Sequence, residues 1–172
     1  RNKNLGFVFQ DFMLLDGLTV FENICLPQII SKAPVPQMEA KARHLCASFG
    51  IENIMEKYPA EISGGEKQRT AVARALMNHP YIILADEPTG NLDSKSRQAV
   101  IQAFLQAKEE MDATVFMVTH DSYAASFCDR VIVLKDGRIY EELVRTSSRK
   151  EFMDELLDVL RVLGGDTEDD LA

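Results

Sequence analysis

Residues 81–134 alternate short apolar runs with helical patterns, and this alternation constrains the fold more than any other feature. The run 81–85 (YIILA) is unbroken and apolar, residues 94–111 return to helical spacing, and 114–118 (TVFMV) form a second apolar run. An unbroken run of this length is typical of a parallel strand covered on both faces. The sequence therefore predicts an α/β fold with a mainly parallel sheet.

Residues 17–75 contain no good strand, so we expect an all-helical region there. Thr19 and Glu22 form a capping-box pattern that predicts a helix from about Val20. Further helices are expected at about 36–49, 52–57 and 66–77. Three prolines are expected to break up the chain after the first helix begins: Pro27, Pro34 and Pro36. A short strand, residues 5–9, precedes this region and ends at Gln10.

The residues after 118 predict a helix, a hairpin and a final helix. The first helix is expected at 122–128, and the Asp136-Gly137 pair suits a tight hairpin turn between 131–134 and 138–140. The final helix has one apolar face, and we expect Gly164-Gly165 to end it. The acidic residues that follow, 166–172, are expected not to pack.

The composition narrows the function classes. The formal charge of −8 over 172 residues disfavours a chain that lies along nucleic acid. Lys67, Arg69 and Arg74 are expected on a solvated helix face, with a local basic patch as the alternative. The three cysteines lack the spacing of a zinc site or a disulfide framework, and no apolar run reaches the roughly 20 residues that span a bilayer. We expect a cytosolic chain.

Two acidic residues follow the run 81–85. Asp86 ends a strand, where open α/β sheets bind ligands, and it is placed to hold Mg²⁺ through water. Glu87 could polarise an attacking water as a general base. The alternative is a strand that merely ends in surface acids.

Three further positions suit phosphate chemistry. Ser63-Gly64-Gly65 precedes a helix, so its amides could face a phosphate, although Ser63 is equally a plain helix cap. His120 follows the run 114–118 and could touch a terminal phosphate, or be structural. Gln10 could ligate Mg²⁺ or hold the water, or be a solvated loop residue.

In this order the motifs resemble the ATPase subunit of ABC transporters, over residues 1 to about 143. By that resemblance Gln10 matches the Q-loop and binds Mg²⁺ with Asp86, and Asp86 with Glu87 matches the Walker B carboxylates. His120 matches the switch histidine. The nucleotide-binding residues carried over from the signature motif and the D-loop (Asn91, Leu92, Asp93) are Ser63, Gly64, Gly65, Glu66, Gln68 and Asp93.

The resemblance implies a P-loop NTPase core with an all-helical subdomain, ATP and Mg²⁺ as ligands, and a mechanism. Two subunits sandwich two ATP molecules head to tail, and closure moves a membrane-spanning permease that docks near the Q-loop. It also implies a cytoplasmic subunit held at the inner face of the cell membrane by that permease. The implied divisions are a core remnant with the Q-loop (1–16), the helical subdomain (17–75), the ATPase core (76–143), and a C-terminal helix with an acidic tail (144–172).

The segments QDFMLLDGLTVFENICLP and ADEPTGNLD are similar to the branch that serves lipoprotein release, macrolide export and peptide-antibiotic resistance. The ending, FMDELLDVLRVLGGD, is similar to bacitracin-type resistance transporters. We therefore expect an ATPase subunit that powers export of, or resistance to, peptide antibiotics.

A phosphate loop, GxxxxGK[ST], is absent from the 172 residues. Because Arg1 opens almost directly into an apolar segment, we expect an N-terminal truncation and a fragment that does not turn over ATP by itself. One alternative is a degenerate partner that supplies only its signature motif, which the retained Glu87 and His120 argue against. Another is a soluble ABC ATPase of DNA repair or translation.

Overall fold

The computed structural model describes the backbone of residues 5–169 and the side chains of residues 5–163. The chain forms two compact units, residues 1–118 and 119–172.

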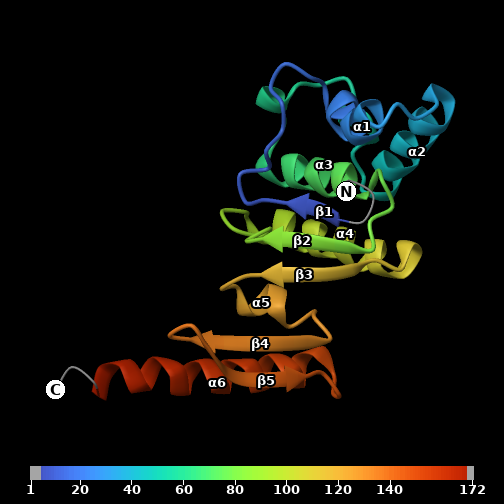
Figure 1. Ribbon diagram of the computed structural model, residues 1–172. Helices are drawn as coiled ribbons and strands as arrows, with labels where there is room; N and C mark the ends of the chain where they lie inside the picture. The colour runs from blue at the N-terminus through green and yellow to red at the C-terminus, as the bar shows by residue number, and fades with distance from the viewer. Residues whose placement is uncertain (1–4, 170–172) are drawn as a thin grey trace. The chain divides into compact units, whose positions relative to one another are not determined.

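The first unit contains a three-stranded parallel sheet in the order β1 (Leu5–Val8), β2 (Ile82–Asp86), β3 (Thr114–Val118). Val8 pairs with Ala85, and Asp86 pairs with Val118. The three arrowheads point the same way in Figure 1, so the carboxyl ends of the strands meet at one edge. The predicted parallel sheet is confirmed.

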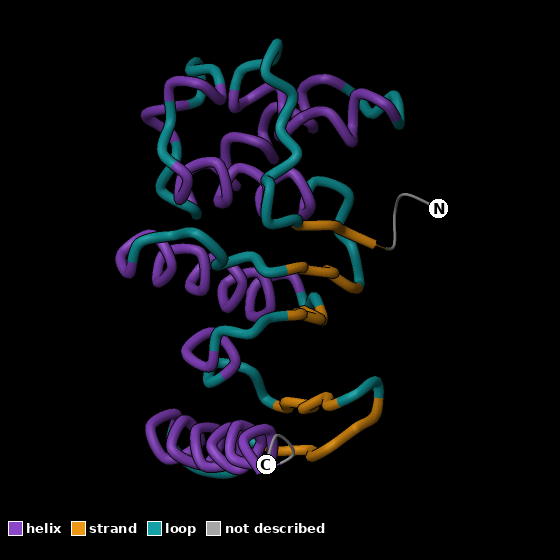
Figure 2. Tube along the Cα trace, turned by 90° about the vertical axis from the view of Figure 1, so that its left-hand side faces the viewer, coloured by secondary structure: helices purple, strands orange, loops and turns teal. Residues whose placement is uncertain are grey.

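Two helices, α3 (Gly64–Leu76) and α4 (Ser94–Met111), pack with the sheet and bury one of its faces. The other face is open: Phe7 and Phe116 are 47% and 58% exposed. Figure 2 shows α4 on one side of the three strands and no described helix of this unit on the opposite side. The expectation that β2 is covered on both faces is therefore wrong for the described residues, because its burial alternates along the strand.

The stretch between β1 and β2 is helical, as predicted. It comprises α1 (Val20–Ile30), α2 (Val35–Ser48), two short 3₁₀ turns (Glu52–Ile54 and Pro59–Glu61) and α3. The helix expected at 52–57 is thus only a 3₁₀ turn, whereas Thr19 and Glu22 form the predicted capping box at the start of α1. The division of the chain at residues 16, 75 and 143 stays a prediction.

The expected break at Pro27 is wrong, because α1 continues through it to Ile30. A proline inside a helix removes one hydrogen bond, but the burial of Ile24 and Cys25 holds this helix to its neighbours. Pro34 and Pro36 do mark a boundary, since they lie at the start of α2, where proline is tolerated best.

The second unit comprises α5 (Ser122–Ala125), an antiparallel hairpin of β4 (Arg130–Lys135) and β5 (Arg138–Val144), and α6 (Arg149–Asp169). Asp136 and Gly137 have φ of 51° and 74°, which confirms the tight turn with positive φ. The helix predicted at 122–128 is shorter, ending at Ala125.

The final helix packs within its own unit. Phe152 and Leu156 are buried, and the Arg149 guanidinium lies 4.6 Å from the ring centre of Phe127. The expected stop at Gly164-Gly165 is wrong, because α6 runs on to Asp169. Glycine weakens a helix by about 1 kcal/mol without forbidding it. The end of the predicted acidic tail, residues 170–172, lies outside the described residues. Among the described residues, no helix is long and apolar enough to cross a membrane.

Candidate functional site

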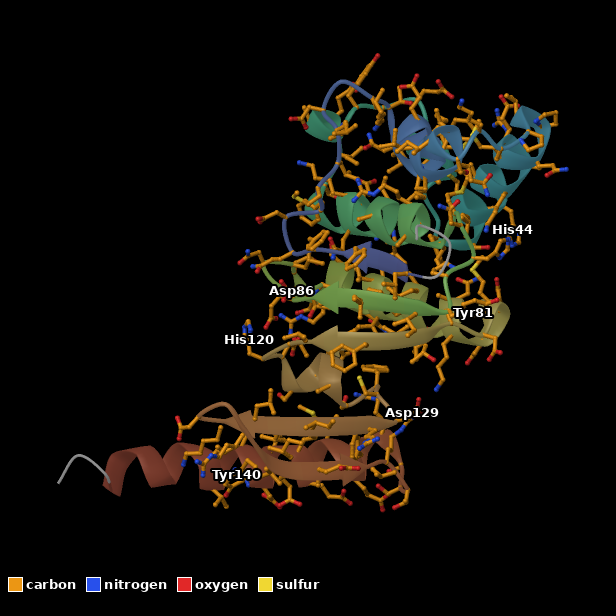
Figure 3. The ribbon with its side chains drawn as sticks, in the orientation of Figure 1. His44, Tyr81, Asp86, His120, Asp129 and Tyr140 are labelled. Atoms are coloured by element: carbon orange, nitrogen blue, oxygen red, sulfur yellow. The ribbon has the colours of Figure 1, made fainter. Side chains whose placement is uncertain are left out.

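The carboxyl edge of the sheet places two of the predicted residues on neighbouring strands. Asp86 is the last residue of β2, and Figure 3 shows it at the arrowhead end of that strand, opposite Tyr81. Gln10 lies two residues beyond the end of β1, which pairs with β2. The parallel sheet therefore brings an exposed carboxylate and an amide to the same edge.

The turn that follows Asp86 has an unusual backbone. Glu87 and Asn91 have φ of 44° and 62°, a left-handed conformation that costs a non-glycine residue about 1–2 kcal/mol. Two backbone hydrogen bonds hold the turn: the Glu87 amide donates to the Val118 carbonyl (2.9 Å) and the Gly90 amide to the Glu87 carbonyl (3.0 Å). Such retained strain concentrates at functional sites.

Gln10 rests directly on this turn. A methyl group built on Gly90 would lie 3.0 Å from Gln10 Nε2 and 3.2 Å from the Glu87 carbonyl oxygen. Gly90 is therefore a close-approach glycine that lets the Gln10 amide reach the segment after the two carboxylates.

The amino end of α3 is closed by its own residues. The Glu66 carboxylate accepts hydrogen bonds from the Ser63 amide and the Ser63 hydroxyl, both at 2.8 Å, and Ser63 Oγ accepts from the Glu66 amide. These hydrogen bonds lower the pKa of Glu66, and the bond from the Ser63 amide has the largest effect. Ser63 is thus an N-cap, as its position predicts, and it is exposed.

The glycine pair has a packing role that sequence reasoning missed. A methyl group on Gly65 would lie 2.5 Å from Ser96 Oγ in α4, whereas one on Gly64 would lie 3.3 Å from the Leu92 side chain and 3.8 Å from the Phe12 ring. Ser96 in turn donates to the Asp93 carboxylate at 2.7 Å. The amino end of α3 therefore lies directly against the first turn of α4.

Asp93 serves as the N-cap of α4. Its carboxylate accepts from the amides of Lys95 and Ser96, both at 3.0 Å, and the Ser96 hydroxyl bond is the main reason its pKa is lowered. An open groove of about 540 Å³ is lined by Ser63 and Glu66 of α3 and by Lys95 and Ser96 of α4. Two helix amino ends meet there, and each is already capped by a carboxylate, that of Glu66 for α3 and that of Asp93 for α4.

Two predicted site residues, Gln68 and His120, are not placed at the groove or at the sheet edge of the first unit. Gln68 is fully buried and donates to the Phe9 carbonyl at 3.4 Å, so its side chain is not exposed in the groove. His120 is exposed and belongs to the second unit, two residues beyond the end of β3. Its approach to Asp86 and Glu87 stays a prediction.

The oxygen atoms at the sheet edge are of the type that binds Mg²⁺. Asp86 and Gln10 offer a carboxylate and an amide oxygen at one edge, and this ion commonly uses one or two protein ligands and keeps several waters. No group of three or more His, Cys, Asp or Glu side chains that could hold a metal occurs among the described residues. A nucleotide would have to complete such a site.

Arg74 differs from what its sequence context suggests. It was expected on a solvated helix face, yet its guanidinium donates to the carbonyls of Phe12 and Met13, the latter through Nη1. Burial lowers the pKa of Arg74. No local pattern could have found this contact, because its partners lie 61 and 62 residues away in the sequence.

Comparison with known proteins identifies the family. Residues 1–90, just over half of the chain, match the sequence profile described as ABC transporter. The chain belongs to the ABC transporter family. The predicted resemblance is thereby confirmed.

Two relatives and one solved structure show how close the match is. The uncharacterized ABC transporter ATP-binding protein YvcR of Bacillus subtilis is 50% identical over 96% of this chain and 64% of its own length. The bacitracin export ATP-binding protein BceA of Halalkalibacterium halodurans is 49% identical over 96% of this chain and 66% of its own. The ATP-binding cassette MJ0796, solved as a dimer in a post-hydrolysis state with ADP and Pi, has a TM-score of 0.74 and 40% identity over 84% of this chain and 64% of its own.

The ABC ATPase fold is thus shown for this chain, with its parallel sheet and its helices. The chain spans about 64% of the length of the first of these relatives.

Proposed function

We propose that this chain is part of an ATP-hydrolysing subunit that powers an ABC transporter. One observation carries the proposal. At the carboxyl edge of the sheet, the Gln10 amide lies against the strained turn that follows Asp86 and begins at Glu87. Membership of the ABC transporter family supports ATP as the ligand of this edge.

Each residue at the edge has a proposed task. Asp86 and Gln10 would hold Mg²⁺, which supplies charge neutralisation to the phosphates when it is bound. Glu87 lies one residue beyond and would accept a proton from the attacking water. His120 would contact the terminal phosphate and stabilise the charge that develops on it.

The amino end of α3 has a separate task in this proposal. Ser63, Gly64, Gly65 and Glu66 would close over a nucleotide held by a second ATPase subunit, arranged head to tail. Glu66, where many family members carry glutamine, would belong to the same contact, and Asp93 would hold the adjoining D-loop in place. The dimeric state of MJ0796 supports a paired arrangement.

The transported class is proposed from the relatives. The likeness to the bacitracin export protein BceA, together with the ending FMDELLDVLRVLGGD, supports export of, or resistance to, peptide antibiotics. The second subunit and a membrane-spanning permease would be the partners, and the permease would hold the subunit at the inner face of the membrane. The absence of GxxxxGK[ST] from the 172 residues supports the prediction that this stretch alone binds ATP weakly.

A Glu87→Gln variant of the natural-length protein tests the proposal. It keeps the shape of the side chain and removes the base, so we expect ATP hydrolysis to fall by about a hundredfold or more while ATP binding persists. Hydrolysis is measured by phosphate release and binding by equilibrium titration. Absence of ATP hydrolysis in the wild-type protein with its permease would contradict the proposal and favour the degenerate partner.

A further inference from the structure

The last turn of α3 holds the segment that carries Gln10. We call residues 9–13 the connector, because it links β1 to the loop before α1. Arg74 Nη2 donates to the Phe12 carbonyl at 2.7 Å, and Nη1 donates to the Met13 carbonyl. One guanidinium therefore fixes two successive carbonyls of the connector.

The backbone of the connector has a conformation that contacts from outside the segment must stabilise. Phe12 and Met13 have φ of 60° and 49°, two successive non-glycine residues in the left-handed region. The local hydrogen bonds span only two or three residues: the Phe12 amide donates to the Phe9 carbonyl and the Met13 amide to the Asp11 carbonyl. A backbone in a sparsely populated region persists only where its surroundings fix it.

The other end of the connector is held by the same helix. Gln68 is fully buried in α3, and its Nε2 donates to the Phe9 carbonyl at 3.4 Å. Three carbonyls of the connector thus depend on two side chains of α3.

The Arg74 guanidinium is well suited to this contact. Burial lowers its pKa, and its hydrogen-bond partners in the connector are two carbonyl oxygens. A planar guanidinium can place two donors on two neighbouring carbonyls, which a single ammonium group cannot reproduce.

The position of the connector decides the position of Gln10. The Gln10 amide lies 3.0 Å from where a methyl group on Gly90 would be, so it lies close against the turn that begins at Glu87. A connector that relaxes out of its left-handed turn would carry Gln10 away from that turn.

We propose that Arg74 is a positioning residue for ATP hydrolysis, which fixes the connector and thereby holds the Gln10 amide beside Asp86 and Glu87. This inference rests on the proposed function. Because Ser63 caps the start of α3 and Arg74 lies in its last turn, the inference also makes one helix responsible both for the end that Ser63 caps and for the placement of Gln10.

Arg74→Lys in the natural-length protein tests the inference. The variant keeps the positive charge in the last turn of α3 and loses the two-carbonyl contact. We expect kcat to fall by about ten- to a hundredfold, as for a misplaced catalytic group, while the Kd for ATP stays within about twofold. In the nucleotide-free protein, we expect faster amide hydrogen exchange at Phe12 and Met13.

Lys41→Gln is the matched control. Lys41 Nζ donates to the Met77 carbonyl at 2.8 Å, so it also ties a long cationic side chain to the end of α3, but it does not touch the connector. We expect this variant to lower the unfolding temperature and to leave both kcat and the exchange of Phe12 and Met13 unchanged.

The outcomes separate the inference from the proposed function. Unchanged exchange in Arg74→Lys would overturn the hold on the connector, and raised exchange with unchanged kcat would overturn its link to hydrolysis. Equal losses of kcat in the Arg74 and Lys41 variants would reduce Arg74 to a general structural role. A wild-type protein without ATPase activity would remove the proposed function itself, and the exchange measurement would still decide whether Arg74 holds the connector.

Discussion

The two ends of α3 are held in different ways. At the amino end, Ser63 and Glu66 bond to each other across three residues. At the carboxyl end, the Met77 carbonyl accepts from Gln28 Nε2 at 2.7 Å and from Lys41 Nζ at 2.8 Å, side chains that are 49 and 36 residues away in the sequence.

This difference separates two tasks. The amino end satisfies its polar groups within its first turn, and Ser63 stays exposed. The carboxyl end ties α1, α2 and the connector together, which keeps the helix in register with the sheet edge.

The largest expected effect comes from the contact between α3 and α4. Gly65→Ala places a methyl group 2.5 Å from Ser96 Oγ, so Ser96 and the Asp93 cap must shift. We expect the free energy of unfolding to drop by about 2–3 kcal/mol, at the upper part of the range for overpacking. Urea unfolding of the natural-length protein measures it.

Gly64→Ala is the control for that variant. Its methyl group would meet the flexible Leu92 side chain at 3.3 Å, so the loss should be clearly smaller. Equal losses for the two alanine variants would show that the close contact with Ser96 does not set the spacing of the two helices.

Ser63→Ala probes the local cap. It removes the hydroxyl that accepts from the Glu66 amide and donates to the Glu66 carboxylate, and we expect a loss of about 1 kcal/mol. Gln28→Ala at the other end should cost less, because Lys41 still donates to the Met77 carbonyl. Thermal or urea unfolding measures both losses. A larger loss of unfolding free energy for Gln28→Ala than for Ser63→Ala would contradict this expectation.

The smallest expected effects are changes in stability with pH. One occurs at acidic pH and the other at alkaline pH. The folded state lowers the pKa of Glu66 from 4.5, so its stabilisation is present above that pH and is lost as the pH falls through the lower folded value. Burial lowers the pKa of Lys41 from 10.5 to about 8, so the unfolded state binds more protons between these values and stability rises with pH across that window.

Difference curves isolate the two groups. The stability of wild type minus that of Glu66→Gln should fall only on the acidic side, and the stability of wild type minus that of Lys41→Met should rise only between about pH 8 and 10.5. Chemical unfolding at a series of pH values gives both curves. Flat curves would mean that neither end of α3 is coupled to protonation.

The local chemistry of this chain is readable from its sequence. The capping box of Thr19 and Glu22, the Asp136-Gly137 turn and the Ser63 cap all depend on residues within a few positions of each other, and each appears as predicted. The parallel sheet follows from the apolar runs, and the edge that brings Gln10 near Asp86 follows from the sheet.

What could not be predicted depends on distant partners. The contact of Arg74 with the connector joins residues about 60 positions apart, and the reason for Gly65 lies in Ser96 of another helix. The path of α1 through Pro27 is likewise decided by burial, since propensity alone argues for a break. The spacing of residues in the sequence does not predict such contacts.

Under the proposed function, Ser63 and Glu87 of one chain serve two different nucleotides. Subunits with Ser63→Ala and with Glu87→Gln, each with its own affinity tag, can be co-expressed and isolated as mixed pairs. In a head-to-tail pair these two changes fall in the same site and leave the other site intact. A pair of wild-type and Glu87→Gln subunits shows how active a single intact site is.

The measurement is ATP hydrolysis by the mixed pair. The account predicts that mixing Ser63→Ala with Glu87→Gln restores the activity of the single-site control, about half of wild type if the two sites are independent, although each variant alone is inactive or nearly so. No recovery, beside an active control pair, would show that Ser63 and Glu87 act on the same nucleotide and would contradict the account.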